Sequence, residues 1–318
     1  MVSGNDGELA AIETIRRGLP GPPAGETWIG DDAAVVVPPT GRHLLLAADA
    51  VVEGVHFDLD LVDAADVGWK VLAVNVSDIA AMGGRPLHAL VTVVGASADM
   101  IEGLVRGLAE AAAAYECAVV GGDLSSGPRL VVSVALTGST GDRGAVLRSG
   151  ARPGDALFVT GPLGSSAAGL RILRSRKGRG GTEPAGPEPA PEALTAAYRR
   201  PVARMAEGLA AAASGATAMI DVSDGLGIDL DRLATASGVG VLLDVCPIAE
   251  GATREEALAG GEDYELVFAA PYPDEVVRAF GAMGLRRPIR IGACVADPAA
   301  RIIGDEHLEA SGYEHRLA

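Results

Sequence analysis

The chain has 318 residues, which is longer than most domains with a single core, so we expect two domains of roughly 150 residues each. Hydrophobic residues make up 48% of it and charged residues 21%, a composition typical of folded globular proteins and unlike that of disordered chains. The 42 acidic and 26 basic residues give a net charge of -16, which argues against binding to nucleic acid or to anionic membranes.

The first residues, MVSGNDGELAAIETI, lack the basic and apolar regions of a signal peptide. No apolar run approaches the roughly 18 residues that a membrane span requires, so we expect a cytoplasmic protein. Cys117, Cys246 and Cys294 are far apart and form no CxxC pair. We interpret them as buried free thiols rather than as a disulfide or a zinc site.

The first half alternates β-rich runs with alanine-rich helical stretches, the pattern of mixed α and β layers. We expect helices within 63–84 and 98–116, where apolar residues recur at helical spacing. The expected strands are HLLLAADAV (43–51), LHALVTVV (87–94), CAVVGG (117–122) and LVVSVALTG (130–138).

A second half begins near SGARPGDALFVTG (149–161), and we place the domain boundary between residues 142 and 143. A strand, a turn and a helix are expected twice, within 156–170 and 217–236, followed by strands at 240–244 and 264–269. Segment 174–192 is rich in Pro and Gly and has almost no apolar side chains. We interpret it as a flexible surface insert, with a functional lid as the alternative.

Acidic residues recur beside glycine at turns, in IGDDAA, GGDLS, VSDGL and GGEDYE. A single carboxylate at such a turn can be a helix cap, and Asp66 or Asp224 alone would fit that role. A larger set that converged would repel itself unless cations neutralised it. All-oxygen ligands without a His/Cys cluster indicate Mg²⁺ or Ca²⁺. The candidate ligands are Asp32, Asp49, Asp78, Asp123, Asp221 and Asp224.

An EF-hand is disfavoured because DVSDGLGIDLDR lacks the required acidic residues of the calcium loop. Magnesium usually binds together with phosphates. The sequence has no Walker G-x4-G-K-[ST] motif, but the Gly-rich turns at 119–127 and 160–170 could cradle phosphate through backbone N–H groups. Arg148 could add a guanidinium, although purely steric turns and a surface arginine are the alternatives.

Nine motifs in this order resemble thiamine-monophosphate kinases, which belong to the superfamily of aminoimidazole-ribonucleotide synthetase. They are IGDDAAVV, ADAVVEGVHF, GWKVLAVNVSDIAAMGG, VVGGDLS, AVLRSGARPGD, TGPLGSSAAGL, MIDVSDGL, GGEDYELVF and GYEHR. The resemblance covers nearly the whole chain except the insert. It implies a two-domain mixed α/β fold and a homodimer joined through strands of the N-terminal domain.

The resemblance also implies phosphorylation of thiamine monophosphate by ATP to give thiamine diphosphate. By motif position, Asp32, Asp49, Asp78, Asp123 and Asp221 would hold magnesium, and Asp224 a further ion. Gly122, Asp123, Arg148 and Ser223 would contact ATP, and His56, Glu262 and Tyr313 would contact the thiamine substrate. Ala47 and Ala48 stand where many relatives have hydroxyl residues, so a backbone carbonyl or water would replace one side-chain metal ligand.

In this reaction the nucleophile would be a phosphate oxygen of thiamine monophosphate. A phosphate monoester has a second pKa of about 6, so it is already largely ionised at neutral pH. We therefore expect no general base, only positioning and charge neutralisation. Tyr313 or Trp69 could face the thiazolium cation, although core packing is the commoner role of such a tryptophan. The rival functions are an ATP-dependent synthase acting on a purine precursor and a noncatalytic protein that binds metal or nucleotide.

Overall fold

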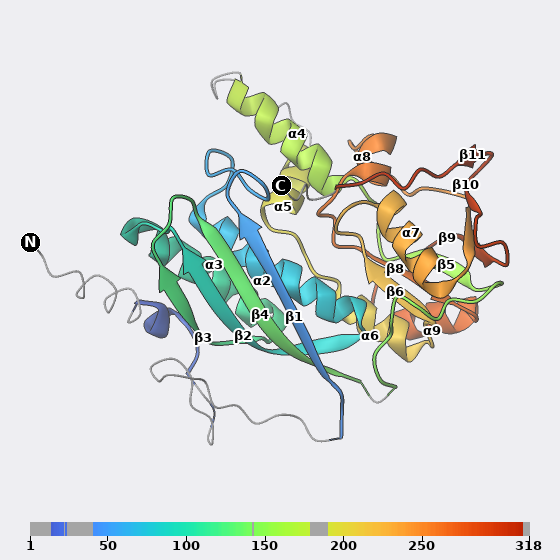
Figure 1. Cartoon of the computed structure of the whole chain (residues 1–318), viewed down its shortest axis with the longest axis horizontal. Helices are drawn as coiled ribbons and strands as arrows, with labels where there is room; N and C mark the ends of the chain where they lie inside the picture. The colour runs from blue at the N-terminus through green and yellow to red at the C-terminus, as the bar shows by residue number, and fades with distance from the viewer. Residues whose placement is uncertain (1–13, 22, 24–40, 142, 179–189, 314–318) are drawn as a thin grey trace, which may run out of the picture. The chain divides into compact units, whose positions relative to one another are not determined.

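A computed structural model describes residues 14–21, 23, 41–141, 143–178 and 190–313 (Figure 1). The chain forms two compact units, one of Met1–Ile79 and Arg85–Ser139 and the other of Ala80–Gly84 and Thr140–Ala318. In the described part of the chain, no helix is both long enough and apolar enough to cross a bilayer.

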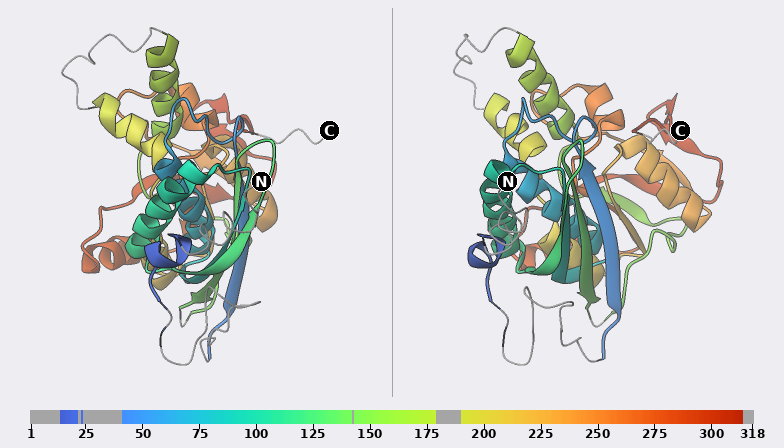
Figure 2. Two further views of the ribbon diagram at one scale, coloured as in Figure 1. Left: turned by 90° about the vertical axis from the view of Figure 1, so that its left-hand side faces the viewer. Right: turned by 60° about the vertical axis from the view of Figure 1, so that its left-hand side comes forward.

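The first unit contains a four-stranded sheet in the order β1-β4-β2-β3, and α2 and α3 lie together on one face of it (Figure 2). β1 pairs antiparallel with β4, and β2 pairs parallel with β3. The elements are β1 (Leu44–Val52), α2 (Ala64–Ala81), β2 (Gly84–Val94), α3 (Ala98–Tyr115), β3 (Ala118–Ser125) and β4 (Val131–Thr140).

Alternation along the strands decides which face of this sheet is covered. In β4, Val132, Val134 and Leu136 are buried, as expected for one face of a pleated strand. Leu46 of β1 and Leu90 of β2 are 74% and 45% exposed. The sheet therefore has one packed face and one apolar face that is open in the single chain.

The second unit contains a seven-stranded mixed sheet in the order β11-β10-β7-β9-β5-β8-β6. Its strands are β5 (Ala156–Val159), β6 (Ala218–Asp221), β7 (Gly240–Leu243), β8 (Leu266–Ala270), β9 (Ile289–Val295), β10 (Arg301–Ile303) and β11 (Glu306–His307). Its helices are α4 (Ser165–Gly178), α5 (Ala190–Arg199), α6 (Met205–Ala213), α7 (Leu226–Ser237), α8 (Arg254–Ala259) and α9 (Pro273–Ala282).

Successive residues of β5 enter two different cores of the second unit. Leu157 and Val159 pack in a cluster with Leu230 of α7, whereas Phe158 packs with residues of α6 and α9. The Phe158 ring stacks on Phe268 at a centroid distance of 5.3 Å. The two-domain mixed fold that the sequence predicted is confirmed.

The expected insert is too long at both ends. Residues 174–178 form the last part of α4, and α5 begins at Ala190, so only 179–189 fall outside the described residues. Arg and Lys have high helix propensity, and a cation near a helix C-terminus is favoured by the helix dipole. Arg176 and Lys177 occupy that position, so this polar segment is the end of a helix rather than part of a linker.

Candidate active site

Asn75 of α2 contacts the backbone of Asp49, a predicted metal ligand, and lies one helical turn before Asp78, a second predicted ligand. The backbone N–H of Asp49 donates to Asn75 Oδ1 at 2.9 Å. Asn75 precedes Asp78 by three residues, so the two side chains share a face of α2. Asn75 is fully buried, and its amide also donates to the Val71 carbonyl at 2.8 Å. The sequence analysis did not identify Asn75, although a polar amide within an apolar helical run could have indicated it.

Ala47 and Ala48 pair with Leu136 and Ala135 of β4, immediately before Asp49 in β1. Neither methyl side chain can supply a ligand oxygen. Any contact of these residues with a metal ion would therefore use the backbone.

Gly122 and Asp123 lie in the exposed second half of β3. A Cβ atom at Gly122 would lie 1.8 Å from the Val91 carbonyl oxygen, so the pairing of β3 with β2 requires glycine here. One carboxylate oxygen of Asp123 accepts a hydrogen bond from the Ser125 hydroxyl at 2.9 Å. Gly122 thus has a structural role whether or not it contacts a nucleotide.

His56 is held in a tight turn that follows β1. Its Nδ1 accepts a hydrogen bond from the Val52 N–H at 3.1 Å, and its carbonyl accepts one from Lys70 Nζ at 3.0 Å. Because Nδ1 is an acceptor, the neutral ring carries its proton on Nε2. Lys70 is only 2% exposed, so a buried lysine helps to fix the turn that presents His56.

The motif MIDVSDGL places Asp221 at the end of β6 and Asp224 just before α7. Arg232 Nη1 bridges Asp224 Oδ2 and Asp229 Oδ1, at 2.5 and 2.7 Å. Asp229 Oδ2 accepts the N–H groups of Asp224 and Gly225, at 2.9 and 3.1 Å. Asp229, and not Asp224, therefore satisfies the backbone at the start of α7. At the start of α2 the cap is Asp63 rather than Asp66, because Asp63 Oδ1 accepts the N–H of Asp66 at 2.8 Å.

Opposing influences act on the Asp229 carboxyl. Burial raises its pKa, and the neighbouring charge of Asp224 acts in the same direction. The N–H groups of Asp224 and Gly225 and the guanidinium of Arg232 favour the ionised form. Asp229 and Arg232 are residues that the sequence analysis missed, and both support Asp224.

The GGEDYE loop, residues 260–265, lies against the loop of Ser223. The N–H of Glu262 donates to the Ser223 carbonyl at 2.7 Å, and that of Tyr264 donates to the Val222 carbonyl at 2.9 Å. Glu262 and Tyr264 have φ angles of 67° and 52°, in the left-handed region that non-glycine residues rarely occupy. The structure thus brings together Ser223 and Glu262, which the sequence assigned to different substrates.

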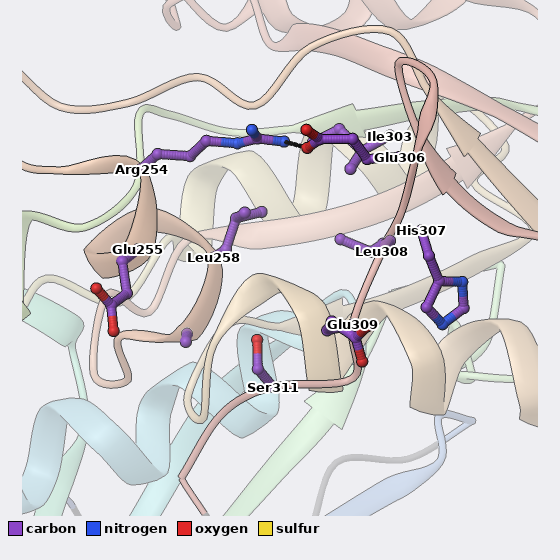
Figure 3. Close-up of a pocket in the computed structure, with 10 residues that line it drawn as sticks. Arg254, Glu255, Leu258, Ile303, Glu306, His307, Leu308, Glu309 and Ser311 are labelled. Carbon is purple, nitrogen blue, oxygen red and sulfur yellow. Dashed lines mark hydrogen bonds and ion pairs between the residues drawn. The ribbon is translucent and has the colours of Figure 1, made fainter.

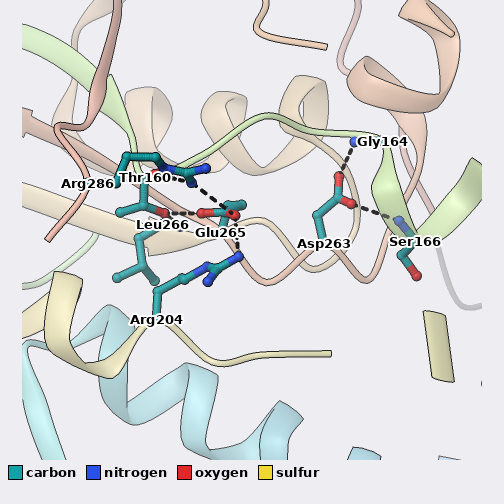
Figure 4. Close-up of polar contacts among 8 residues, drawn as sticks. All are labelled: Thr160, Gly164, Ser166, Arg204, Asp263, Glu265, Leu266 and Arg286. Carbon is teal, nitrogen blue, oxygen red and sulfur yellow. Dashed lines mark hydrogen bonds and ion pairs between the residues drawn. The ribbon is translucent and has the colours of Figure 1, made fainter. Parts of the chain in front are cut away.

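Asp263 reaches from this loop to the first turn of α4 (Figure 4). Its carboxylate accepts the N–H of Gly164 at 2.5 Å and that of Ser166 at 3.1 Å. The Gly-rich turn at 160–170 was one candidate phosphate cradle, but a carboxylate of the protein already occupies these donors. Burial raises the pKa of Asp263 to about 7, although its backbone hydrogen bonds oppose that shift.

Glu265 anchors the other end of the loop and has a side chain that is 5% exposed. Its Oε1 lies 2.7 Å from Arg204 Nη2 and 3.8 Å from Arg286 Nη2. Its Oε2 accepts the Thr160 hydroxyl proton at 2.5 Å (Figure 4). Asp263 and Glu265 were not predicted, because their partners are far away in the sequence.

Tyr313 lies beside the start of α7, where its N–H donates to the Asp224 carbonyl at 2.9 Å. Its side chain is exposed. Arg148 is also exposed, and its carbonyl accepts a hydrogen bond from Ser237 Oγ at 3.0 Å. Trp69 packs on Tyr115 with ring centroids 5.8 Å apart, which favours the core role for this tryptophan.

Asp32 lies outside the described residues. Among those that the structure does describe, no group of three or more His, Cys, Asp or Glu gathers as a metal site. A pocket of about 420 Å³ in the second unit is lined by α8, by Ile303 at the end of β10 and by residues between 306 and 311, and no predicted site residue lines it (Figure 3). The three cysteines are free, as predicted, although Cys246 is only half-buried.

Comparison with known proteins decides the family. The N-terminal and C-terminal domain models of AIR synthase related proteins match residues 30–140 and 152–305. The thiamine-monophosphate kinase of Bacillus subtilis (strain 168) is 35% identical over 308 residues, which cover 91% of this chain and 93% of that protein. The chain belongs to the thiamine-monophosphate kinase family.

Two solved structures of this kinase family extend the match to three dimensions. The thiamine-monophosphate kinase of Stenotrophomonas maltophilia K279a is 34% identical, with a TM-score of 0.79, over 95% of this chain and 97% of that one. AaThiL complexed with AMPPCP and TMP is also 34% identical, with a TM-score of 0.77, over 88% of this chain and 89% of that one.

Proposed function

We propose that this protein transfers the terminal phosphoryl group of ATP to thiamine monophosphate, forming thiamine diphosphate and ADP. The observation that carries the proposal is the similarity to AaThiL, which was solved with AMPPCP and TMP. AMPPCP is an analogue of ATP, so that relative binds a nucleoside triphosphate analogue together with TMP. We assign the same pair of substrates to this chain.

We assign the substrate contacts by the motifs that carry them. His56, Glu262 and Tyr313 would contact the thiamine monophosphate, and Gly122, Asp123, Arg148 and Ser223 would contact ATP. Phosphoryl transfer requires the two substrates to lie next to each other. The hydrogen bond between the Glu262 N–H and the Ser223 carbonyl supports these assignments, because it holds a residue of each group side by side. The fixed Nδ1 of His56 supports a donor role for its Nε2.

We propose that magnesium ions are held by the carboxylates of Asp32, Asp49, Asp78, Asp123, Asp221 and Asp224. The all-oxygen donor set fits magnesium, which usually completes its coordination shell with phosphate oxygens and water. When bound, magnesium neutralises phosphate charge. The acceptor phosphate is already ionised at neutral pH, so no residue is assigned as a general base.

We propose that the chain forms a homodimer through the open face of the four-stranded sheet. Leu44 and Leu46 of β1 and Leu90 of β2 are large apolar side chains exposed on elements of the first unit. Apolar surface gathered in this way is typical of association surfaces. We also place the protein in the cytoplasm, where three free cysteines would stay reduced.

Phosphorus NMR of the protein incubated with ATP, Mg²⁺ and thiamine monophosphate tests the activity. We expect resonances of a new diphosphate ester together with ADP, and no reaction when thiamine replaces its monophosphate. A folded protein that binds ATP without forming this product would refute the proposal and favour a noncatalytic nucleotide-binding protein. ATP turnover only with a purine precursor would favour the synthase alternative.

A further inference from the structure

The GGEDYE loop holds an unfavourable backbone conformation. Among the described residues, three that are not glycine have positive φ angles, namely Glu116, Glu262 and Tyr264, and two of these lie in this loop. Such a conformation is unfavourable for a residue with a Cβ atom and persists only where the surroundings impose it. The contacts that impose it therefore determine where Glu262 points.

The loop is fixed by the side chains of Asp263 and Glu265 and by the backbone hydrogen bonds of Glu262 and Tyr264. Glu265 is bound by Arg204 and Thr160, while Asp263 binds the N–H groups of Gly164 and Ser166. Glu262 lies directly before Asp263, so a shift of the Asp263 backbone would move the Glu262 backbone and its side chain with it. The hydrogen bonds of the Asp263 carboxylate to the N–H groups of Gly164 and Ser166 oppose such a shift.

We propose that Asp263 is a positioning residue for the thiamine substrate. Its carboxylate ties the loop to the first turn of α4 and so holds Glu262 in the orientation that contacts the substrate. This inference rests on the proposed function, since it takes Glu262 as a substrate contact. It assigns Asp263 a purpose beyond helix capping, because the cap is supplied by a loop 97 to 99 residues away rather than by the residue before α4.

Asp263→Asn weakens the contact of the loop with the first turn of α4 and hardly changes the shape of the side chain. The amide keeps one acceptor oxygen but turns an NH₂ group toward the second backbone N–H, so one of the two hydrogen bonds is lost. We expect KM for thiamine monophosphate to rise by at least about tenfold, while KM for ATP and kcat stay within about threefold. A residue that only stabilises α4 would lower the melting temperature without this selective change.

Asp155→Asn is the matched control. Asp155 is 3% exposed and accepts the Arg152 N–H at 2.9 Å and the Thr217 hydroxyl proton at 2.6 Å, just before β5 and at the opposite end of that strand from Thr160. This variant also loses part of a buried carboxylate network. We expect its melting temperature to fall while KM for both substrates stays within about twofold of the wild-type values.

Hydrogen exchange measures, without any substrate, how firmly the contact of Asp263 with Gly164 and Ser166 holds the loop. In Asp263→Asn, the N–H groups of Glu262 and Tyr264 should exchange faster than in the wild type and in Asp155→Asn, because their hydrogen bonds depend on the loop conformation. Absence of wild-type turnover would refute the proposed function, while faster exchange would still support the role of this contact in holding the loop. Unchanged exchange, or an unchanged KM in an active enzyme, would overturn the positioning role. If Asp263→Asn does not fold, Asp263→Ser, which keeps one acceptor, is measured in the same way.

Discussion

Two predicted metal ligands of the first unit and two carboxylates of the GGEDYE loop in the second unit have different surroundings. In the first unit, Asp49 and Asp123 are exposed on the regular strands β1 and β3. In the second unit, Asp263 and Glu265 are bound by backbone N–H groups, a hydroxyl and guanidinium groups, and they shape the loop that contains them. Asp49 and Asp123 thus lie on strands that other residues hold in place, whereas Asp263 and Glu265 themselves hold their loop in place. Loss of a carboxylate of the first pair should therefore affect activity alone, and loss of one of the second pair should affect activity and folding.

The largest effect is expected on turnover, in Asp49→Asn and Asp224→Asn. Each change removes one charge from a proposed metal ligand, so we expect kcat to fall at least about a hundredfold at saturating substrates and Mg²⁺. The two variants should differ in their melting temperatures, measured without metal. Asp49→Asn should leave that temperature unchanged, whereas Asp224→Asn should lower it slightly, because the pair with Arg232 is lost.

Asp231→Asn serves as the control for these two variants. Asp231 also lies on α7 and pairs with Arg301 at 2.7 Å, but it is not a proposed ligand. It should lower the melting temperature about as much as Asp224→Asn and retain turnover. Near-normal turnover in both Asp49→Asn and Asp224→Asn would make the metal assignment wrong and leave these residues with structural roles.

The next largest effect is expected on stability, in Glu265→Gln. The change keeps the shape of a nearly buried side chain but removes the charge that pairs with Arg204, whose Nε atom has no hydrogen-bond partner among the described residues. We expect the free energy of unfolding, measured with urea, to fall by about 2 kcal/mol. Glu306→Gln, at an exposed pair with Arg254, should change it by less than about 0.5 kcal/mol. Equal effects in the two variants would contradict the scaffold role of Glu265.

Local sequence patterns predicted the elements because each is defined by its own residues. Alternating apolar residues marked β4, and helical spacing marked α2 and α3 to within a few residues of their observed bounds. Patterns within a segment do not specify the partner of a strand, so the order β1-β4-β2-β3 was not predicted. The polar end of α4 was missed for a related reason, since an exposed helix end needs no apolar residues.

The predicted site residues came from motifs, whereas the residues that hold them came only from the structure. GGEDYE was interpreted as one acidic turn, yet its three carboxylates have different surroundings. Asp263 binds backbone groups at Gly164 and Ser166, and Glu265 pairs with Arg204, which lies 61 residues away in the chain. Such contacts depend on tertiary packing and leave no local pattern. Asn75 and Arg232 were missed in the same way.

A smaller effect is expected when pH is varied in Asp263→Asn. Burial raises the pKa of Asp263 from 3.8 to about 7. As pH rises, the unfolded chain therefore loses this proton at a lower pH than the folded chain does. The stabilisation from protonated Asp263 is complete below pH 3.8 and is lost as pH rises through about 7. Asparagine does not titrate. The difference in unfolding free energy, variant minus wild type, should therefore increase by about 1 kcal/mol between about pH 6 and pH 8. Parallel pH curves would show that Asp263 does not titrate in this range.

The smallest effect is expected when residues 179–189 are replaced by a Gly/Ser linker of equal length. This stretch contains no large apolar side chain and no residue of the family motifs, so its replacement should leave the melting temperature unchanged and turnover within about twofold. Extending the replacement to 174–192 should lower the melting temperature, because it removes the end of α4 and the start of α5. A selective rise in KM for either substrate with the shorter replacement would support the lid alternative, and it would mean that a segment without large apolar side chains contributes to substrate binding.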